Sequence, residues 1–296
     1  CRVRGAGVLC WGVVGARRRR AVHRVRVHAV VGVVSVCSVI ITVSAENGQK
    51  QKLYVLSSVT DQAYIIDPAT NEITGAIAVG GQPHGLAIPE SQDVVYFVTE
   101  ADNKIVVVDP VTDEILGKYP VGDTPNEPDI TPDGKFVYVP ARHEGVYEVW
   151  DTEKKEIVAR IRTKGLPHNA VASPDGRFMY LSPQGDNDMI YVADTKTHTV
   201  HATIDTTYGP RPIAVSPDGK WLYVNTDNLL GFKVLDLENY TVAAVAEYEL
   251  TDKEKAEKSR SHGVVATPDG KEVWSSDVNH ELVFVFDVTQ MPPKQI

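Results

Sequence analysis

The sequence predicts an all-β protein, a β-propeller of four-stranded antiparallel blades, because three series of residues recur in one register. Aromatic residues recur at steps of 42, 42, 42, 43 and 51 residues, at Tyr54, Tyr96, Tyr138, Tyr180, Tyr223 and Trp274. An aspartate closes an apolar run in each period, at Asp67, Asp109, Asp151, Asp194, Asp236 and Asp287. Pro-Asp-Gly recurs at Asp133, Asp175, Asp218 and Asp269. Repeats of this length without helical periodicity are typical of propeller blades.

Each period shows its four strands in order. Residues 168–173 form a short apolar strand, and Pro-Asp-Gly turns the chain because proline is preset for the first corner and glycine accepts positive φ. Residues 178–182 form the second strand. Runs such as "VYEVWD" form the third strand, and alternating runs such as "EIVARI" form the fourth. We interpret the recurrent aromatic residues as core residues between neighbouring blades.

Blades can be counted from these patterns. The chain opens with the second, third and fourth strands of a blade, over residues 53–79. Four complete blades are expected to begin near His84, Asn126, His168 and Arg211. A last blade begins near His262 and shows only the start of a fourth strand, at residues 294–296. Because open blade edges expose unpaired backbone, we expect about six visible blades of seven, in a protein that continues beyond Ile296.

The first 45 residues form a separate segment. They hold eight arginines and no acidic residue, then an uncharged apolar run over 29–43 that ends in Val43-Ser44-Ala45. This order predicts a secretory signal peptide cleaved near Ala45, with the propeller in residues 46–296 and a periplasmic or extracellular location. The alternative is an uncleaved anchor helix, which would be the only contact with a membrane. All three cysteines lie in this segment, so the propeller has no disulfide.

The charge of the propeller excludes one class of partner. Eight of the 30 Lys and Arg residues lie in residues 1–45, which leaves 22 in the propeller against 39 Asp and Glu residues. A body this acidic repels phosphate backbones, so we expect no nucleic-acid partner. We expect a monomer that binds a small polar ligand, a metal or a partner protein.

Three stretches of the repeats resemble the YVTN family of β-propeller repeat proteins. They are "SPDGKWLYVNTD", "TPDGKFVYVP" and "DPATNEITGAIAVGGQPHGLAI", and the resemblance covers nearly all of residues 53–290. It implies a secreted or periplasmic protein with seven blades. The wider superfamily includes lactonase-like propellers and the propellers of haem d1 and nitrous oxide reductases. The resemblance implies the fold more firmly than an activity.

Histidines gather at one predicted face. His84, His168 and His262 share a repeat position directly before the innermost strand, and Asn126 and Arg211 are its equivalents in other blades. Loops between second and third strands return to the same face. The predicted ligand-binding residues at the mouth of the central channel are therefore His84, Asn126, His168, Arg211, His262, His143, His280 and Glu100. The remaining propeller histidines, His198 and His201, lie on an outer strand and should face solvent.

The residues at the mouth of the channel suit either metal binding or polar-ligand binding, and a purely structural role is the alternative. Imidazoles of His84, His168 and His262 could bind Zn²⁺ or Cu²⁺ together. They could also hydrogen-bond a polar or anionic ligand, which Arg211 favours. The alternative is that each imidazole only caps backbone groups. The spacing is periodic, without a ligand-like HxH or HxxxH pair at the mouth.

No catalytic residue is predicted, because the chain has no GxSxG, HExxH or phosphate-binding glycine loop. The sequence therefore favours a binding propeller over an enzyme. The alternatives are a metal- or cofactor-assisted enzyme of lactonase or oxidoreductase type, and a surface-layer or protein-interaction propeller.

One loop, "ELTDKEKAEKSRSH", breaks the period, and Thr251 followed by Glu254 has capping-box spacing. We expect a short helix there, as a lid or as a solvated insertion.

Overall fold

The computed structural model describes residues 25–26, 51–259 and 261–296, and these residues form β-strands with a single four-residue α-helix and one 3-10 turn. The described chain divides into two compact units. Unit 1 holds residues 51–144 and 148–158, and unit 2 holds residues 25–26, 145–147 and 159–296 without residue 260. The predicted signal peptide and its cleavage site lie outside the described residues, apart from the strand at 25–26. Among the described residues no helix is long and apolar enough to cross a membrane.

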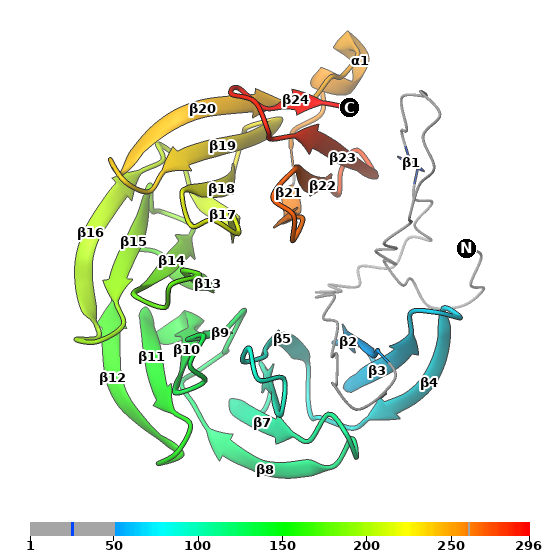
Figure 1. Ribbon diagram of the computed structural model, residues 1–296, viewed down its shortest axis with the longest axis vertical. Helices are drawn as coiled ribbons and strands as arrows, with labels where there is room; N and C mark the ends of the chain where they lie inside the picture. Colours follow the sequence, from blue (N-terminus) through cyan, green and yellow to red (C-terminus); the bar gives the residue numbers. More distant parts are fainter. Residues whose placement is uncertain (1–24, 27–50, 260) are drawn as a thin grey trace. The chain divides into compact units, whose positions relative to one another are not determined.

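Unit 1 begins with the partial blade that the sequence predicts. A three-stranded sheet is followed by a four-stranded sheet in the order β5-β6-β7-β8, and both are antiparallel (Figure 1). The strands of these two blades are β2 (Leu53–Ser57), β3 (Gln62–Asp67), β4 (Glu72–Ile77), β5 (Pro83–Ala87), β6 (Val95–Thr99), β7 (Lys104–Val108) and β8 (Ile115–Pro120).

The third blade has the order β12-β11-β10-β9, and the boundary between the units passes through its two outer strands. Its elements are β9 (Asp129–Ile130), β10 (Phe136–Ala141), the 3-10 turn η1 (Arg142–Glu144), β11 (Val146–Asp151) and β12 (Glu156–Arg162).

Unit 2 contains the next three blades. Two are four-stranded, and in the third, β24 pairs with β23 as the start of a fourth strand, while β1 pairs with the same strand. The strands are β13 (Leu166–Ala172), β14 (Phe178–Gln184), β15 (Met189–Asp194), β16 (Thr199–Asp205), β17 (Pro210–Val215), β18 (Trp221–Thr226), β19 (Gly231–Asp236), β20 (Thr241–Glu247), β21 (Ser261–Ala266), β22 (Glu272–Asp277), β23 (Leu282–Asp287), β24 (Lys294–Gln295) and β1 (Val25–Arg26). The predicted all-β propeller fold and its blade order are confirmed.

Local chemistry explains the turns within each blade. In the Pro-Asp-Gly turn, the Ser173 hydroxyl donates to the Asp175 carboxylate at 2.7 Å and accepts from the Phe178 N–H at 2.9 Å. Gly176 adopts φ +71°, which a residue with a side chain rarely takes. Asp194, at the end of the third strand, accepts from the N–H groups of the next turn. Both periodic aspartate series therefore close turns and belong to the scaffold.

The recurrent aromatic residues lie in the core, as predicted. Tyr54, Tyr96, Tyr138, Tyr180 and Tyr223 are buried, and Trp274 is half-buried. Edge-to-face ring contacts join successive blades within each unit, as between Tyr54 and Phe97 at 5.7 Å and between Phe232 and Phe286 at 4.9 Å. These contacts fix each blade against the next one in its unit.

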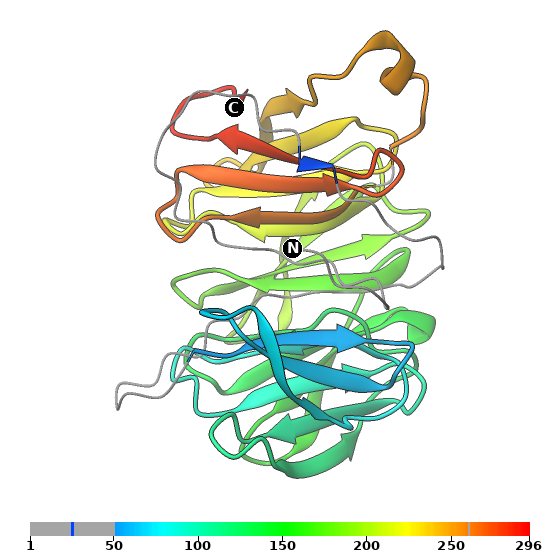
Figure 2. The same cartoon turned by 90° about the vertical axis from the view of Figure 1, so that its right-hand side faces the viewer.

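The loop that breaks the period forms the predicted short helix, α1 (Asp252–Lys255), which projects beyond the strands of unit 2 (Figure 2). Thr251 and Glu254 complete the predicted capping box. We refer to residues 251–259 as the insertion. No side chain in it is buried.

Candidate functional site

Four predicted site residues lie at an irregularity of the innermost strands, namely His84, His168, Arg211 and His262. In β5, Pro83 pairs with Thr99 and Gly85 pairs with Val98, so His84 is an extra residue in the ladder. His262 is the extra residue of β21 in the same way. The ladder shifts at the start of β13 and β17 as well. Bulges re-aim side chains and are common beside functional sites. The histidines therefore lie within the innermost strands, as a correction to the prediction that they precede them.

Glu100 is held opposite His84 by backbone hydrogen bonds. It follows β6, and its N–H donates to the Gln82 carbonyl at 2.9 Å. The next N–H, of Ala101, donates to the Gly81 carbonyl at 3.2 Å. The turn after β6 is therefore hydrogen-bonded to the segment that enters β5. As a result, the Glu100 and His84 side chains face each other.

Asn126 is placed by the loop that leads into β9. Its N–H donates to the Pro140 carbonyl at 3.0 Å, and the buried Glu148 carboxylate accepts from the Gly122 N–H at 2.7 Å. Gly85 lies against this loop so closely that a Cβ there would be 2.6 Å from the Asn126 carbonyl oxygen. Only glycine fits that approach of the two backbones. Blade-to-blade contact in unit 1 therefore sets the position of Asn126 beside His84.

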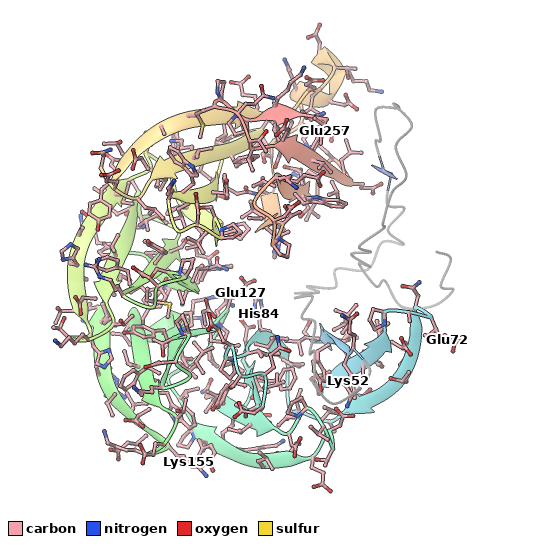
Figure 3. The ribbon with its side chains drawn as sticks, viewed as in Figure 1. Lys52, Glu72, His84, Glu127, Lys155 and Glu257 are labelled. Atoms are coloured by element: carbon pink, nitrogen blue, oxygen red, sulfur yellow. The ribbon has the colours of Figure 1, made fainter. Side chains whose placement is uncertain are left out.

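Three side chains of unit 1 meet at one carboxylate oxygen of a fourth residue, Glu100. The Asn126 Nδ2 donates to Glu100 Oε1 at 2.7 Å, the Arg142 Nη2 lies 3.4 Å from the same oxygen, and the His84 Nε2 lies 3.8 Å from it. We call His84, Glu100, Asn126 and Arg142 the Glu100 cluster. Figure 3 shows His84, at the start of β5, beside Glu127.

The cluster combines burial with unfinished hydrogen bonding. Asn126 is fully buried, yet within the described residues its Oδ1 has no hydrogen-bond partner, and the same holds for the Arg142 Nε. Each such atom costs about 1–3 kcal/mol of folding free energy and calls for an explanation. The Glu100 and Arg142 side chains keep 17% and 20% exposure, so the group remains open to solvent. This is the arrangement of a site that a polar molecule could complete.

His143 is not part of the cluster. It is exposed in η1, where its Nδ1 lies 3.2 Å from the Asp123 Oδ2 and 3.0 Å from the Thr124 hydroxyl. The Thr124 hydroxyl and then His143 hold the pKa of Asp123 below its usual value. This surface group flanks the loop that carries Asn126.

The predicted residues of unit 2 have contacts of their own. His168 is buried, its N–H donates to the Tyr147 hydroxyl at 3.1 Å, and its Nδ1 lies 2.6 Å from the Asn169 Oδ1. The Arg211 Nη2 lies 3.9 Å from the Asp227 Oδ1. His262 is half-buried.

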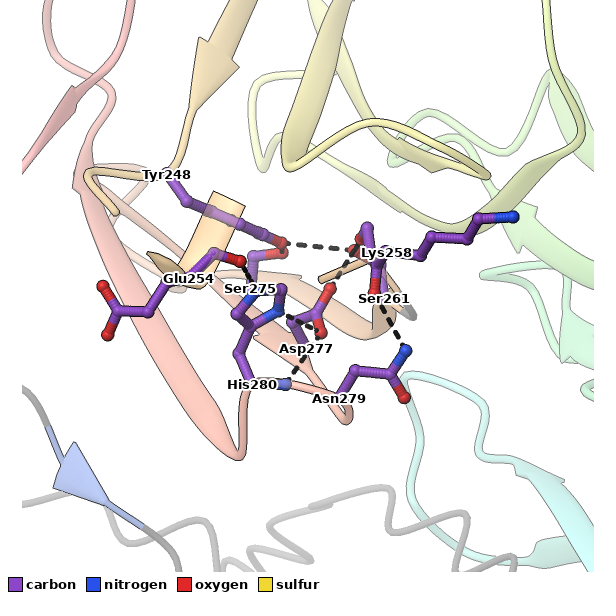
Figure 4. Close-up of polar contacts among 9 residues, drawn as sticks. Tyr248, Glu254, Lys258, Ser261, Ser275, Asp277, Asn279 and His280 are labelled. Carbon is purple, nitrogen blue, oxygen red and sulfur yellow. Dashed lines mark hydrogen bonds and ion pairs between the residues drawn. The ribbon is translucent and has the colours of Figure 1, made fainter. Parts of the chain in front are cut away.

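His280 binds protein groups at both ring nitrogens. The imidazole faces the Asp277 Oδ1 at 2.8 Å and the Glu254 carbonyl at 2.9 Å, and its side chain is 1% exposed (Figure 4). These contacts make it an anchor for the insertion, although the sequence predicted a ligand-binding residue at this position.

A shared metal site finds no support in the part of the chain that the structure describes. There, no group of three or more His, Cys, Asp or Glu side chains is arranged to hold a metal ion. His84 belongs to unit 1, whereas His168 and His262 belong to unit 2, so their convergence on one ligand stays a prediction.

Sequence reasoning missed Arg142, although a signal was present. Arg142 follows Tyr138 by four residues, as Glu100 follows Tyr96 and Asp227 follows Tyr223. Comparing this repeat position with the repeat position of the histidines would have pointed to a guanidinium beside a carboxylate in each unit. These pairs are Arg142 with Glu100 and Arg211 with Asp227. The residue type at this repeat position differs from blade to blade, so a search for identical residues does not find it.

Two comparisons with known proteins agree with this fold. A sequence model of the family described as "Lactonase, 7-bladed beta-propeller" matches residues 41–291. Among solved structures, Kuenenia stuttgartiensis hydrazine synthase matches with a TM-score of 0.71 and 21% sequence identity, over 80% of this chain and 73% of that chain. Among curated protein sequences, none matches significantly. The matches support the propeller superfamily that the YVTN resemblance implied, and the YVTN repeat itself stays a prediction.

Proposed function

The chain belongs to the lactonase family of seven-bladed β-propellers, and from that premise we propose that it is a binding propeller whose Glu100 cluster holds a small polar ligand. The observation that carries this proposal is the meeting of Asn126, Arg142 and His84 on one oxygen of Glu100. The buried Asn126 Oδ1 and Arg142 Nε still lack partners among the described residues. A scaffold contact would satisfy those atoms within the protein.

The charges of the cluster favour a ligand rich in hydroxyl groups. Arg142 and Glu100 carry opposite charges that offset each other, so neither a strong anion nor a strong cation is selected. Guanidinium and amide N–H groups need acceptors, whereas the carboxylate and the Asn126 Oδ1 need donors. A hydroxyl group supplies both. The acidic body, with 39 Asp and Glu residues along the whole chain, further disfavours a highly charged anion.

The proposal is tested by thermal shift and calorimetry with neutral sugars, sugar alcohols and their lactones. We expect at least one compound to raise the Tm of the wild type, and Glu100→Gln or Arg142→Lys to weaken its binding about tenfold, the usual effect of one lost charged hydrogen bond. Asp227→Asn, at the same repeat position in unit 2, is the matched control and should bind normally. Equal binding by Glu100→Gln, or no shift with any compound, refutes the proposal.

Lactone hydrolysis is the second candidate, because the family description names it and because His84 and Glu100 lie 3.8 Å apart as a possible acid–base pair. Proton release from lactones in a weakly buffered assay measures it. Turnover by the wild type that Glu100→Gln abolishes would favour this candidate over simple binding.

Export is a further part of the proposal, and the basic and apolar leader of residues 1–45 supports it. We expect exported protein to begin at Glu46 or a close neighbour. Mass spectrometry of the periplasmic or secreted fraction measures this, and recovery of only the full-length chain from the cytosol would exclude it.

A further inference from the structure

The insertion is attached to its own unit by polar contacts rather than by a core. Three groups on β22 and the turn after it hold it: His280 faces the Glu254 carbonyl at 2.9 Å, the Asn279 Nδ2 donates to the Lys258 carbonyl at 2.8 Å, and Asp277 accepts from the Ser259 hydroxyl (Figure 4). We call the blade formed by β21, β22, β23 and β24 blade six. Because the insertion buries no side chain, these bonds decide whether it stays on blade six.

The His280 contacts specify a protonation state. Its two ring nitrogens face the Asp277 carboxylate and the Glu254 carbonyl, and both are acceptors. A neutral imidazole has one N–H and could satisfy only one of them, leaving a lone pair directed at the other oxygen. The imidazolium donates to both. We propose that this imidazolium is a pH-sensitive latch, which holds the insertion on blade six at acidic pH and releases it as the pH rises.

The charged groups around His280 agree with the latch. Asp277 comes from β22, and the carboxylate of Glu257 comes from the insertion. The Glu254 carboxylate turns away to accept from the Thr251 N–H, and Lys258 contributes its carbonyl to Asn279. Burial would lower the pKa of His280, but the hydrogen bonds to Asp277 and the Glu254 carbonyl raise it above its ordinary value.

The sign of the pH dependence follows from the raised pKa of His280. A histidine whose pKa is raised on folding stabilises the closed insertion fully below its ordinary pKa of about 6.5, and the contribution is lost as the pH rises through the higher folded-state value. Among side chains, only histidine ordinarily titrates between pH 5 and 8. When His280 loses a proton, Asp277 retains the Nδ1–H, so the bond to the Glu254 carbonyl is the one that breaks.

Hydrogen exchange of the full chain tests the latch. After correction for intrinsic exchange, we expect protection of residues 251–259 to fall about tenfold between pH 5.5 and 8.5, the effect of losing one charged hydrogen bond. His280→Ala should show low protection at both pH values. Asn279→Ala removes an anchor that does not titrate. It should lower protection at both pH values and leave the ratio of protection between pH 5.5 and pH 8.5 unchanged. His262→Gln and His198→Asn, the near and distant histidine controls, should behave as the wild type.

Ring ¹⁵N shifts of His280 in the wild type give a second measurement that needs no variant. We expect a doubly protonated ring at pH 5.5 that becomes the Nδ1–H tautomer over the range in which protection is lost. A neutral ring at pH 5.5, equal wild-type protection at both pH values, or an unchanged pH ratio in His280→Ala would overturn the proposal.

Discussion

A histidine faces a carboxylate in each unit, and the two pairs are built differently. In unit 2, the His280 Nδ1 lies 2.8 Å from the Asp277 Oδ1, and the two side chains are 1% and 0% exposed. In unit 1, the His84 Nε2 lies 3.8 Å from the Glu100 Oε1, and the side chains are 8% and 17% exposed. The first pair is closed and complete, whereas the second is wider and open to solvent.

The difference shows that a recurring histidine does not have one role in this fold. Asp277 is engaged by the His280 ring, the His280 N–H and the Ser259 hydroxyl, so its oxygens serve the scaffold. The side-chain contacts of Glu100 gather on Oε1, and its neighbour Asn126 retains a buried acceptor without a partner among the described residues. Completeness of the hydrogen bonds separates an anchor from a candidate ligand site.

The largest expected effect compares the two carboxylates directly. Asp277→Ala would leave a buried imidazolium and the Ser259 hydroxyl without their acceptor, and breaking a buried pair in this way costs roughly 3 kcal/mol. Glu100→Ala removes a partly exposed group and should cost about 1 kcal/mol. Urea unfolding measures both values. Equal losses for the two variants would show that the Glu100 pair is structural as well.

A second change tests how unit 1 places its site. Gly85→Ala puts a Cβ 2.5 Å from Pro128 and 2.6 Å from the Asn126 carbonyl, so the loop that carries Asn126 must shift. We expect a loss of about 2 kcal/mol from overpacking, together with loss of ligand binding. Gly75→Ala is the control, because its nearest atom, in Ile65, lies at an ordinary 3.4 Å. If Gly85→Ala binds as well as Gly75→Ala, contact between β5 and this loop does not position the site.

The smallest expected effect concerns the exposed turns, where both units use the same chemistry. Hydrogen bonds from the Thr267 hydroxyl and then from the Lys271 N–H lower the pKa of Asp269 to about 2. A depressed pKa stabilises the fold above the unfolded value of about 3.9, and the contribution is lost as the pH falls through the folded value. The stability difference between wild type and Asp269→Ala should therefore be present at pH 7 and shrink between about pH 4 and 2.

Carboxyl ¹³C titration gives the Asp269 midpoint directly, and urea unfolding at several pH values gives the stability difference. A midpoint near 4, or a difference that persists at pH 2, would contradict the role assigned to this turn. Asp133, the equivalent aspartate of unit 1, has a lowered pKa as well, so Asp133→Ala should follow the same pH profile.

Much of the fold was determined by the sequence alone, because its information is local. The Pro-Asp-Gly turn joins Ser173, Asp175 and Phe178, which lie within six residues of one another. Short apolar runs likewise place the inner strands, and period-two alternation places the fourth strands, without reference to distant residues. The strand order of every blade follows from such segments, and so does the capping box of Thr251 and Glu254.

The site depended on tertiary structure, because its contacts join residues that no local pattern links. Asn126 reaches Glu100 from a position 26 residues away, and His280 reaches Glu254 over the same separation. Repeat position placed His84, His280 and Glu100 at one face, but it could not reveal which histidine would meet a carboxylate that is already satisfied. That outcome is decided by the neighbouring blade and by the insertion, since burial and hydrogen-bond geometry exist only after the blades pack.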